Sequence, residues 1–169
     1  MQSEKNFRQH GRMSVYEHSL AVARMCLRIA KYFPGEVDMR SLVRGALLHD
    51  YFLYDWHILD ESHKWHGVTH AGDALKNARR DFELNEIEQD MIRKHMFPLN
   101  LALPRYKETV VIVLVDKYCS LTETLAYWGI GRAGFYVWRI RYAPQKRQLK
   151  DIRISIYSCK NQRIYAIKY

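Results

Sequence analysis

The chain has 169 residues, of which 48% are hydrophobic and 27% are charged, and it carries a formal net charge of +9. This length and composition fit one soluble globular domain that buries a core of its own without disulfides or a structural metal. No apolar run approaches the roughly 18–20 residues that span a bilayer, and the polar start, Met1–Lys5, lacks the apolar core of a signal peptide. We therefore expect a cytoplasmic protein with no membrane association.

Three widely separated cysteines, Cys26, Cys119 and Cys159, show no C-x-x-C spacing, so neither a disulfide framework nor a zinc knuckle is indicated. The excess of positive over negative charge comes from the end of the chain: residues 132–169 hold ten of the 27 basic residues and one of the 18 acidic ones, whereas residues 1–131 hold 17 of each. This change in composition predicts a first domain over residues 1–131 and a basic extension over residues 132–169. The extension could bind nucleic acid, an acidic partner or a polyphosphate substrate, or it could be a solvated surface.

Two helices are predicted in the first 50 residues. Ser14 and Glu17 form a capping-box pattern, and the helix that follows has an apolar face that carries His18. His18 therefore points inward, either as a metal ligand or as a core histidine bonded to a carbonyl. The second helix begins after Asp38, and its spacing places His49 on the core side of the last turn with Asp50 beside it.

Further histidines occur at two later helices. His66 and His70 lie four residues apart at a predicted helix start, so both could reach one metal, and a pair of surface histidines is the alternative. Asn85 predicts the start of another helix, on which His95 faces partly inward. The segment Tyr51–Lys64 is aromatic and irregular, which is typical of a loop bordering a cleft.

The most apolar predicted helix runs from Thr109 to Trp128 and carries Asp116 on its buried face. Burying an unpaired carboxylate costs several kcal/mol, which is a large part of the roughly 5–15 kcal/mol by which a folded domain is stable. A salt bridge to Lys117 is one possible compensation, but neighbouring side chains diverge on a helix. A cation that Asp116 shares with the inward histidines compensates all of these groups together.

In the basic extension the spacing of apolar residues changes from a helical pattern to alternation. Ile152, Ile154 and Ile156 alternate with polar residues, Cys159–Gln162 has turn composition, and Arg163–Tyr169 is again rich in Ile and Tyr. The pattern predicts a β-hairpin, with an amphipathic helix or disorder as alternatives.

Neutral imidazole and ionised carboxylate ligands suit a divalent first-row metal: Mn, Fe, Co, Ni or Zn. The candidate ligands are more numerous than one ion usually takes from protein, and two ions roughly 3.5–4 Å apart would use them better. Such a centre predicts hydrolysis by a water whose pKa falls toward about 7, directed at a phosphorus atom.

The order H…HD…H…H…D over residues 14–125 resembles the HD superfamily of metal-dependent phosphohydrolases. His18 in Tyr-Glu-His-Ser-Leu-Ala, the doublet His49-Asp50, and Asp116 in Val-Asp-Lys match its minimal one-metal set. His70 in Thr-His-Ala-Gly-Asp and His95 in Arg-Lys-His-Met match the extra histidines of two-metal members such as bacterial diadenosine tetraphosphate hydrolases. The resemblance implies an all-α helical bundle with one or two divalent metals, in which Asp50 bridges the metals and is catalytic.

The chain departs from the commonest family pattern just after the doublet, where Tyr51-Phe-Leu-Tyr-Asp replaces the frequent Ile-Gly-Lys, and His66 competes with His70 as the third-helix ligand. Cyclic-dinucleotide activity therefore cannot be carried over. The expected substrate is a nucleotide or another small phosphate ester, and Tyr51, Tyr54 and Trp56 could stack a base or simply pack. Candidate phosphate-binding cations are Arg44, Lys64, Lys94 and Lys117, each with an ordinary surface role as the alternative.

Two other functions share these features. A di-iron oxygenase of the same fold would use the same ligands with iron and dioxygen, whereas a regulatory or nucleic-acid-binding module would use the basic tail on a structural metal scaffold. An oligomer is also compatible with the sequence.

Overall fold

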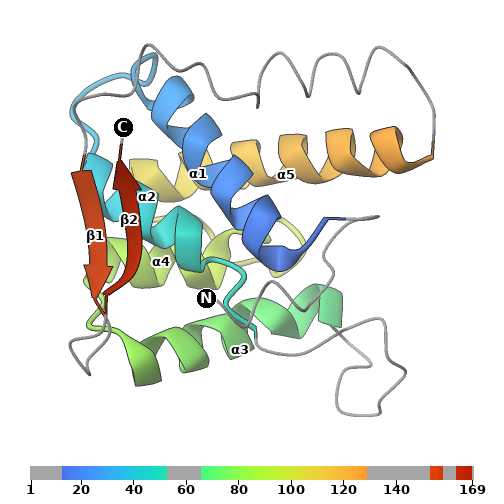
Figure 1. The fold of residues 1–169 in the computed structure, drawn as a ribbon. Coiled ribbons are helices and arrows are strands. Elements are labelled where there is room, and N and C mark those ends of the chain that lie inside the picture. Colours follow the sequence, from blue (N-terminus) through green and yellow to red (C-terminus); the bar gives the residue numbers. More distant parts are fainter. Residues whose placement is uncertain (1–12, 53–65, 129–152, 158–162, 169) are drawn as a thin grey trace.

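The structure is a computed structural model, and it describes residues 13–52, 66–128, 153–157 and 163–168. Within these ranges the chain forms five helices and one two-stranded sheet, which confirms the predicted all-α bundle with a small C-terminal hairpin. The helices are α1 (Val15–Ala30), α2 (Met39–Leu48), α3 (His66–Asp81), α4 (Glu86–Lys94) and α5 (Lys107–Tyr127). The strands are β1 (Arg153–Tyr157) and β2 (Arg163–Lys168) (Figure 1).

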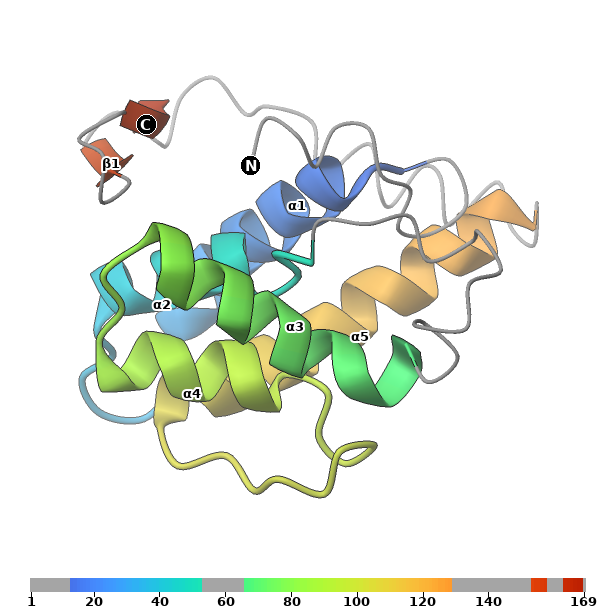
Figure 2. The same cartoon turned by 90° about the horizontal axis from the view of Figure 1, so that it is seen from below.

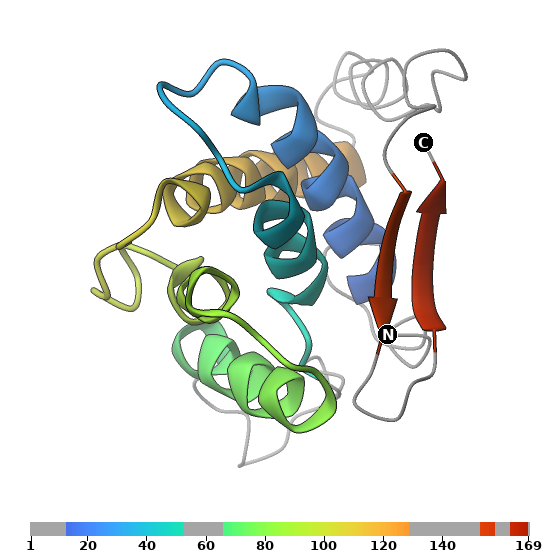
Figure 3. The same cartoon turned by 90° about the vertical axis from the view of Figure 1, so that its left-hand side faces the viewer.

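The short helix α2 lies at the centre of the bundle, where it contacts α1, α4 and α5 (Figure 3). Helix α3 packs along α4 on the side away from α1 (Figure 3). The view from below shows α3 running beside α4 (Figure 2). The C-terminal end of α2 is therefore surrounded by the other helices. This position brings His49 and Asp50 within reach of side chains that are far away in the sequence.

The helix starts follow the predicted capping signals. Ser14 and Glu17 form the complete capping box of α1, with the Ser14 Oγ accepting from the backbone N–H of Glu17 at 3.3 Å. The side chain of Asp38 caps α2, and Asn85 caps α4 in a second capping box. Each such cap stabilises its helix by about 1 kcal/mol, and it also fixes the position at which the helix begins. The register that places each histidine on its face is thus set locally.

The core consists mainly of aliphatic side chains from the five helices, and α5 is buried along much of its length. Cys26 and Cys119 carry reduced thiols and are fully buried, and burial raises the pKa of the Cys26 thiol well above its ordinary value. Both agree with the interpretation of core cysteines, while Cys159 lies outside the described residues. Within the described ranges, no helix is long and apolar enough to cross a membrane.

The packing of α2 on α4 depends on Gly45. A Cβ added there would come within 2.6 Å of the Met91 Sδ and 3.2 Å of its Cβ. Because Met91 is fully buried, it has little room to move, and we expect Gly45→Ala to reduce the free energy of unfolding by about 1–2 kcal/mol despite the better helix propensity of alanine. The matched control is Gly72→Ala on α3, where nothing lies within 4 Å, and there we expect a gain of up to about 1 kcal/mol. Urea unfolding of both variants measures the difference, and equal effects would contradict the close approach.

The strands β1 and β2 pair antiparallel, with Ile154 opposite Ile167 and Ser155 opposite Ala166, which confirms the predicted hairpin. The pairing becomes irregular between Ile156 and Tyr157. The predicted turn, Cys159–Gln162, lies outside the described residues. The division into domains at residue 131 stays a prediction.

Candidate metal centre

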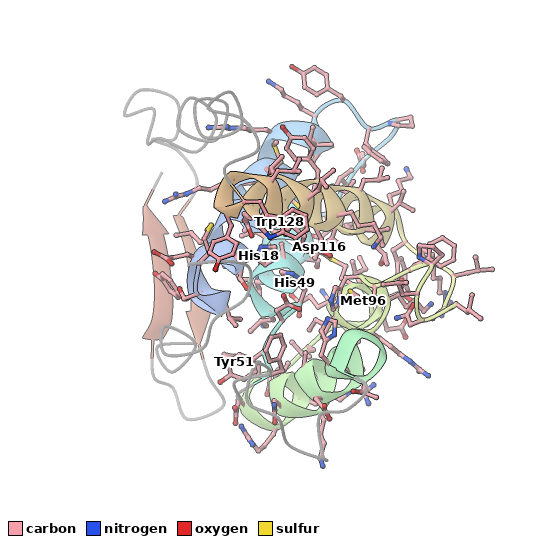
Figure 4. All side chains as sticks on the ribbon, turned by 90° about the vertical axis from the view of Figure 1, so that its right-hand side faces the viewer. His18, His49, Tyr51, Met96, Asp116 and Trp128 are labelled. Atoms are coloured by element: carbon pink, nitrogen blue, oxygen red, sulfur yellow. The ribbon has the colours of Figure 1, made fainter. Side chains whose placement is uncertain are left out.

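Six of the predicted ligands come together in the interior of the bundle. His18 lies in the first turn of α1, His49 and Asp50 follow the last residue of α2, and His95 follows the last residue of α4. None of the six residues is more than 6% exposed. Figure 4 shows His18, His49 and Asp116 pointing toward one another from α1, α2 and α5. The full set is His18, His49, Asp50, His70, His95 and Asp116.

The first group of ligand atoms surrounds Asp116. Its Oδ1 lies 3.1 Å from the Nε2 of His18 and 3.6 Å from the Nε2 of His49. The three side chains offer one ligand atom each, all within 4.8 Å of one another, which is close enough for one ion. Ser120, one turn further along α5, donates its hydroxyl to the same Asp116 oxygen at 3.3 Å.

The second group surrounds Asp50. Its Oδ1 lies 3.4 Å from the Nε2 of His70 and 3.3 Å from the Nε2 of His95, and these two nitrogens are 3.0 Å apart. Its other oxygen, Oδ2, lies 3.4 Å from the Nε2 of His49 and 3.9 Å from the Nε2 of His18. The two oxygens of one carboxylate therefore face two different pairs of histidines.

Backbone carbonyls fix the orientation of two of the rings. The Nδ1 of His49 lies 2.8 Å from the Ala46 oxygen, and the Nδ1 of His95 lies 2.9 Å from the Ile92 oxygen. Since a carbonyl only accepts, both Nδ1 atoms must carry the proton. In the neutral ring the Nε2 atoms then direct their lone pairs into the centre, as metal-binding histidines do.

The ring of His18 is held differently, by a residue that the sequence reasoning missed. Glu123 on α5 is buried, and its Oε2 lies 2.8 Å from the Nδ1 of His18. A sequence signal for it existed, because Glu123 lies seven residues after Asp116 and therefore on the same face of an apolar helix. The spacing that picked out Asp116 as an inward carboxylate applies equally to Glu123.

The charges within the centre support one another. Burial by itself raises the pKa of Asp50, but the neighbouring His49, His95 and His70 outweigh it and hold that pKa far below its ordinary value. The pKa of Asp116 is also held well below its usual range, because the effect of burial is outweighed by His18 and His49. Both carboxyl groups are therefore ionised at neutral pH, as metal ligands must be.

One buried ligand atom of the centre lacks a hydrogen-bond partner among the described residues, as expected where a metal ion binds. The buried Nε2 of His49 makes no hydrogen bond with any part of the chain that the structure describes. Such a buried polar atom costs about 1–3 kcal/mol unless a partner is supplied. A cation beside Asp116 would supply it. Neutral imidazole and carboxylate groups together suit divalent first-row metals.

Metal binding is expected to weaken as the pH falls. Burial lowers the pKa of His18, but the charge of Glu123 and hydrogen bonds to Asp116 and Glu123 outweigh it and raise that pKa well above 6.5. The metal-free protein therefore keeps protons on both nitrogens of this ring at neutral pH, and a metal ion must displace the proton on Nε2. We expect Zn²⁺ affinity to fall up to about tenfold per pH unit below the pKa of His18. Isothermal titration between pH 6 and 8, in buffers of different ionisation enthalpy, measures the proton release. Affinity and proton release that do not change with pH would contradict this.

The structure places the candidate phosphate-binding cations unequally. Arg44 pairs with Glu88 at 3.2 Å and donates to the Glu83 carbonyl, and Lys94 pairs with Asp90, so both charges are already balanced. The Lys117 Nζ instead donates to the carbonyl oxygen of His95 at 3.1 Å, beside the centre. Its described hydrogen-bond partner is therefore this carbonyl and not the Asp116 carboxylate. Lys64 lies outside the described residues.

The segment after the doublet begins as core. Tyr51 packs its ring against Phe82, with the centroids 5.5 Å apart, and donates its hydroxyl to Asp81. Because Tyr51 is buried, the packing alternative holds for it and the base-stacking interpretation does not. Phe52 contacts the ring of His70. Tyr54 and Trp56 lie outside the described residues. The side chain of His66 lies outside them too, so the choice between His66 and His70 as the ligand stays open.

The fold and the buried cluster of histidines and aspartates define a helical domain with a candidate metal centre. A family model described as HD domain matches residues 15–121, which is more than half of the chain. This chain therefore belongs to the HD-domain family, whose members bind divalent metals and generally act as metal-dependent hydrolases. Searches of the curated proteins and of the solved structures found no significant match.

Proposed function

We propose that this protein is a metal-dependent phosphohydrolase that acts on a nucleotide or another small phosphate ester. The proposal includes a centre of two divalent transition metals (Fe, Mn, Co, Ni or Zn), with His18, His49 and Asp116 around one position and His70 and His95 around the other. Asp50 would be shared between them and would be the catalytic carboxylate.

The arrangement of Asp50 is the observation that carries this proposal. Its Oδ1 faces His70 and His95, while its Oδ2 faces His49 and His18. A carboxylate between two sets of imidazole donors is the arrangement expected for a bridging ligand of a dinuclear site. A single-metal site would leave the second pair of histidines, whose Nε2 atoms are 3.0 Å apart, without a role.

The side chains of the centre would hold the metals, and the metals would supply a water activated near neutral pH and a Lewis acid for the phosphoryl oxygens. Lys117 is the best-placed cation among the described candidates, because its ammonium group contacts the backbone of His95. Burial lowers the pKa of this group, as its side chain is about half buried. Exchanging the carbonyl partner for a phosphate oxygen would let Lys117 orient the substrate at the edge of the centre.

The test is a substrate panel measured alongside metal content. The full chain is loaded with Mn²⁺ or Fe²⁺ and assayed for phosphate release from nucleoside mono-, di- and triphosphates, dinucleoside polyphosphates and sugar phosphates. We expect turnover of at least one class and its loss in His49→Ala. Full metal occupancy without turnover of any phosphate compound would overturn the proposal. Oxygen consumption by the iron-loaded protein would instead favour the oxygenase alternative.

A further inference from the structure

Glu123 is a buried carboxylate that lies directly behind the ring of a proposed metal ligand, His18. It sits in the penultimate turn of α5, 4% exposed, with its Oε2 2.8 Å from the Nδ1 of His18. Its other oxygen, Oε1, is buried and makes no hydrogen bond within the described residues. The contact joins α5 to α1 at the end of the bundle where His18 lies.

A carboxylate held in this way is costly for folding. Burying a charge is unfavourable unless the group is paired and fully hydrogen-bonded, and half of this carboxylate is not hydrogen-bonded. Helix α5 is otherwise strongly apolar, and an aliphatic residue at position 123 would pack α5 against α1 without this penalty. The carboxylate is therefore better explained by what it does to His18 than by stability.

The contrast with the other histidines shows what it does. His49 and His95 each give their Nδ1 proton to a neutral backbone carbonyl, whereas His18 gives it to a carboxylate. A carboxylate behind an imidazole fixes the ring with Nε2 forward and increases the basicity of that nitrogen. The Nε2 of His18 is the atom that lies 3.1 Å from Asp116.

The negative charge is also distributed unequally between the two groups of ligands. Asp50 faces both groups, but Asp116 lies only in the group of His18 and His49, and Glu123 stands directly behind His18. The second group of described ligand atoms close enough for one ion, His49, Asp50 and His95, includes no carboxylate besides Asp50. A divalent cation is attracted more strongly where more anionic groups lie nearby.

We propose that Glu123 is a positioning residue that holds the Nε2 of His18 toward the centre, and that it makes the position formed by His18, His49 and Asp116 the tighter of two metal positions. This inference rests on the proposed metal centre and extends it by ranking its two positions. The expected sequence of loading follows: the first equivalent of metal enters beside Asp116, and the second enters between His70 and His95.

The test compares Glu123→Gln with Glu108→Gln, using Zn²⁺ alone as the probe. Both glutamates are buried on α5, and Glu108 accepts a hydrogen bond from the backbone of Asp38 at 2.7 Å, far along the helix from His18. Glutamine keeps an acceptor in each place and removes only the charge. We expect Glu123→Gln to weaken the tighter of the two Zn²⁺ affinities about 10- to 100-fold and to leave the weaker one within about twofold. Glu108→Gln should change neither.

Nitrogen NMR of the histidine rings gives a second readout that does not depend on activity. In the zinc-loaded protein, His18 should bind through Nε2 and carry a slowly exchanging Nδ1 proton, which Glu123→Ala should expose to exchange with water. Coordination of His18 through Nδ1, or an unchanged tighter affinity in Glu123→Gln, would overturn the inference. If Glu123→Ala does not fold, the spectrum of the unmodified protein still decides the first point. A protein that binds no Zn²⁺ at all would instead count against the proposed function.

Discussion

Asp50→Asn is expected to remove bound metal and to lower kcat/KM by at least about 10³-fold, which corresponds to about 4 kcal/mol of transition-state stabilisation. The reason is that both oxygens of Asp50 face histidine pairs, so that one substitution weakens both metal positions. The Asp50 carboxylate is also kept ionised by its neighbours, and the neutral asparagine amide lacks that charge. Elemental analysis of the purified variant and steady-state kinetics on the best substrate of the panel measure both effects.

The matched control for this prediction is Asp38→Asn. It makes the same chemical change at the start of α2, where asparagine is as good an N-cap as aspartate, so metal content and activity should be retained. Metal should also stabilise the unsubstituted protein by about 2.7 kcal/mol at a hundredfold excess over Kd, and it should not stabilise Asp50→Asn. An Asp50→Asn protein that keeps two equivalents of metal would show that the carboxylate is not a shared ligand.

His70→Ala and His95→Ala are each expected to reduce the metal content from two equivalents to one. Their Nε2 atoms are 3.0 Å apart and both face the same oxygen of Asp50, so either substitution leaves the second position with too few ligands. The first position, formed by His18, His49 and Asp116, keeps its own ligands and should retain its ion. Activity should fall with the loss of the second ion, because a centre of two ions polarises both attacking and leaving oxygens.

The control for the histidine variants is His66→Ala. His66 competes with His70 in the sequence pattern, so the two substitutions separate the alternatives directly. We expect His66→Ala to keep two equivalents, because His70 is the α3 histidine with a described contact to Asp50. Loss of one equivalent in His66→Ala and none in His70→Ala would exchange their roles. Two equivalents in both His70→Ala and His95→Ala would place the second ion elsewhere.

The inward positions of the histidines were accessible from periodicity. His18 and His49 follow caps that set the helix register, and each lies on a continuous apolar face, so both were predicted to point inward and both are fully buried. Asp116 was found by the same reasoning in reverse, as a carboxylate in a run too apolar to tolerate it unpaired. The family resemblance then related these residues to one another, and the family match over residues 15–121 confirms it.

Contacts between side chains on different helices could not be predicted from the residue spacing within each helix. The pairing of Arg44 with Glu88 joins α2 to α4, and nothing in the spacing of either helix indicates it. The sequence left base stacking open for Tyr51, but in the structure its hydroxyl donates to Asp81 at the end of α3 and its ring packs against Phe82. Glu123 had a usable signal in its seven-residue distance from Asp116, but its partner lies 105 residues earlier in the chain. Long-range partners of this kind depend on how the helices cross.

By itself, the sequence determined which residues face the interior, because helix caps and apolar periodicity are local properties of the chain. It also determined the family, through the order and context of His18, the His49-Asp50 doublet and Asp116. Only the tertiary structure decided which oxygen of Asp50 faces which histidines, and which acceptor lies behind each ring. These relations span helices far apart in the sequence, and they are set by close packing around α2.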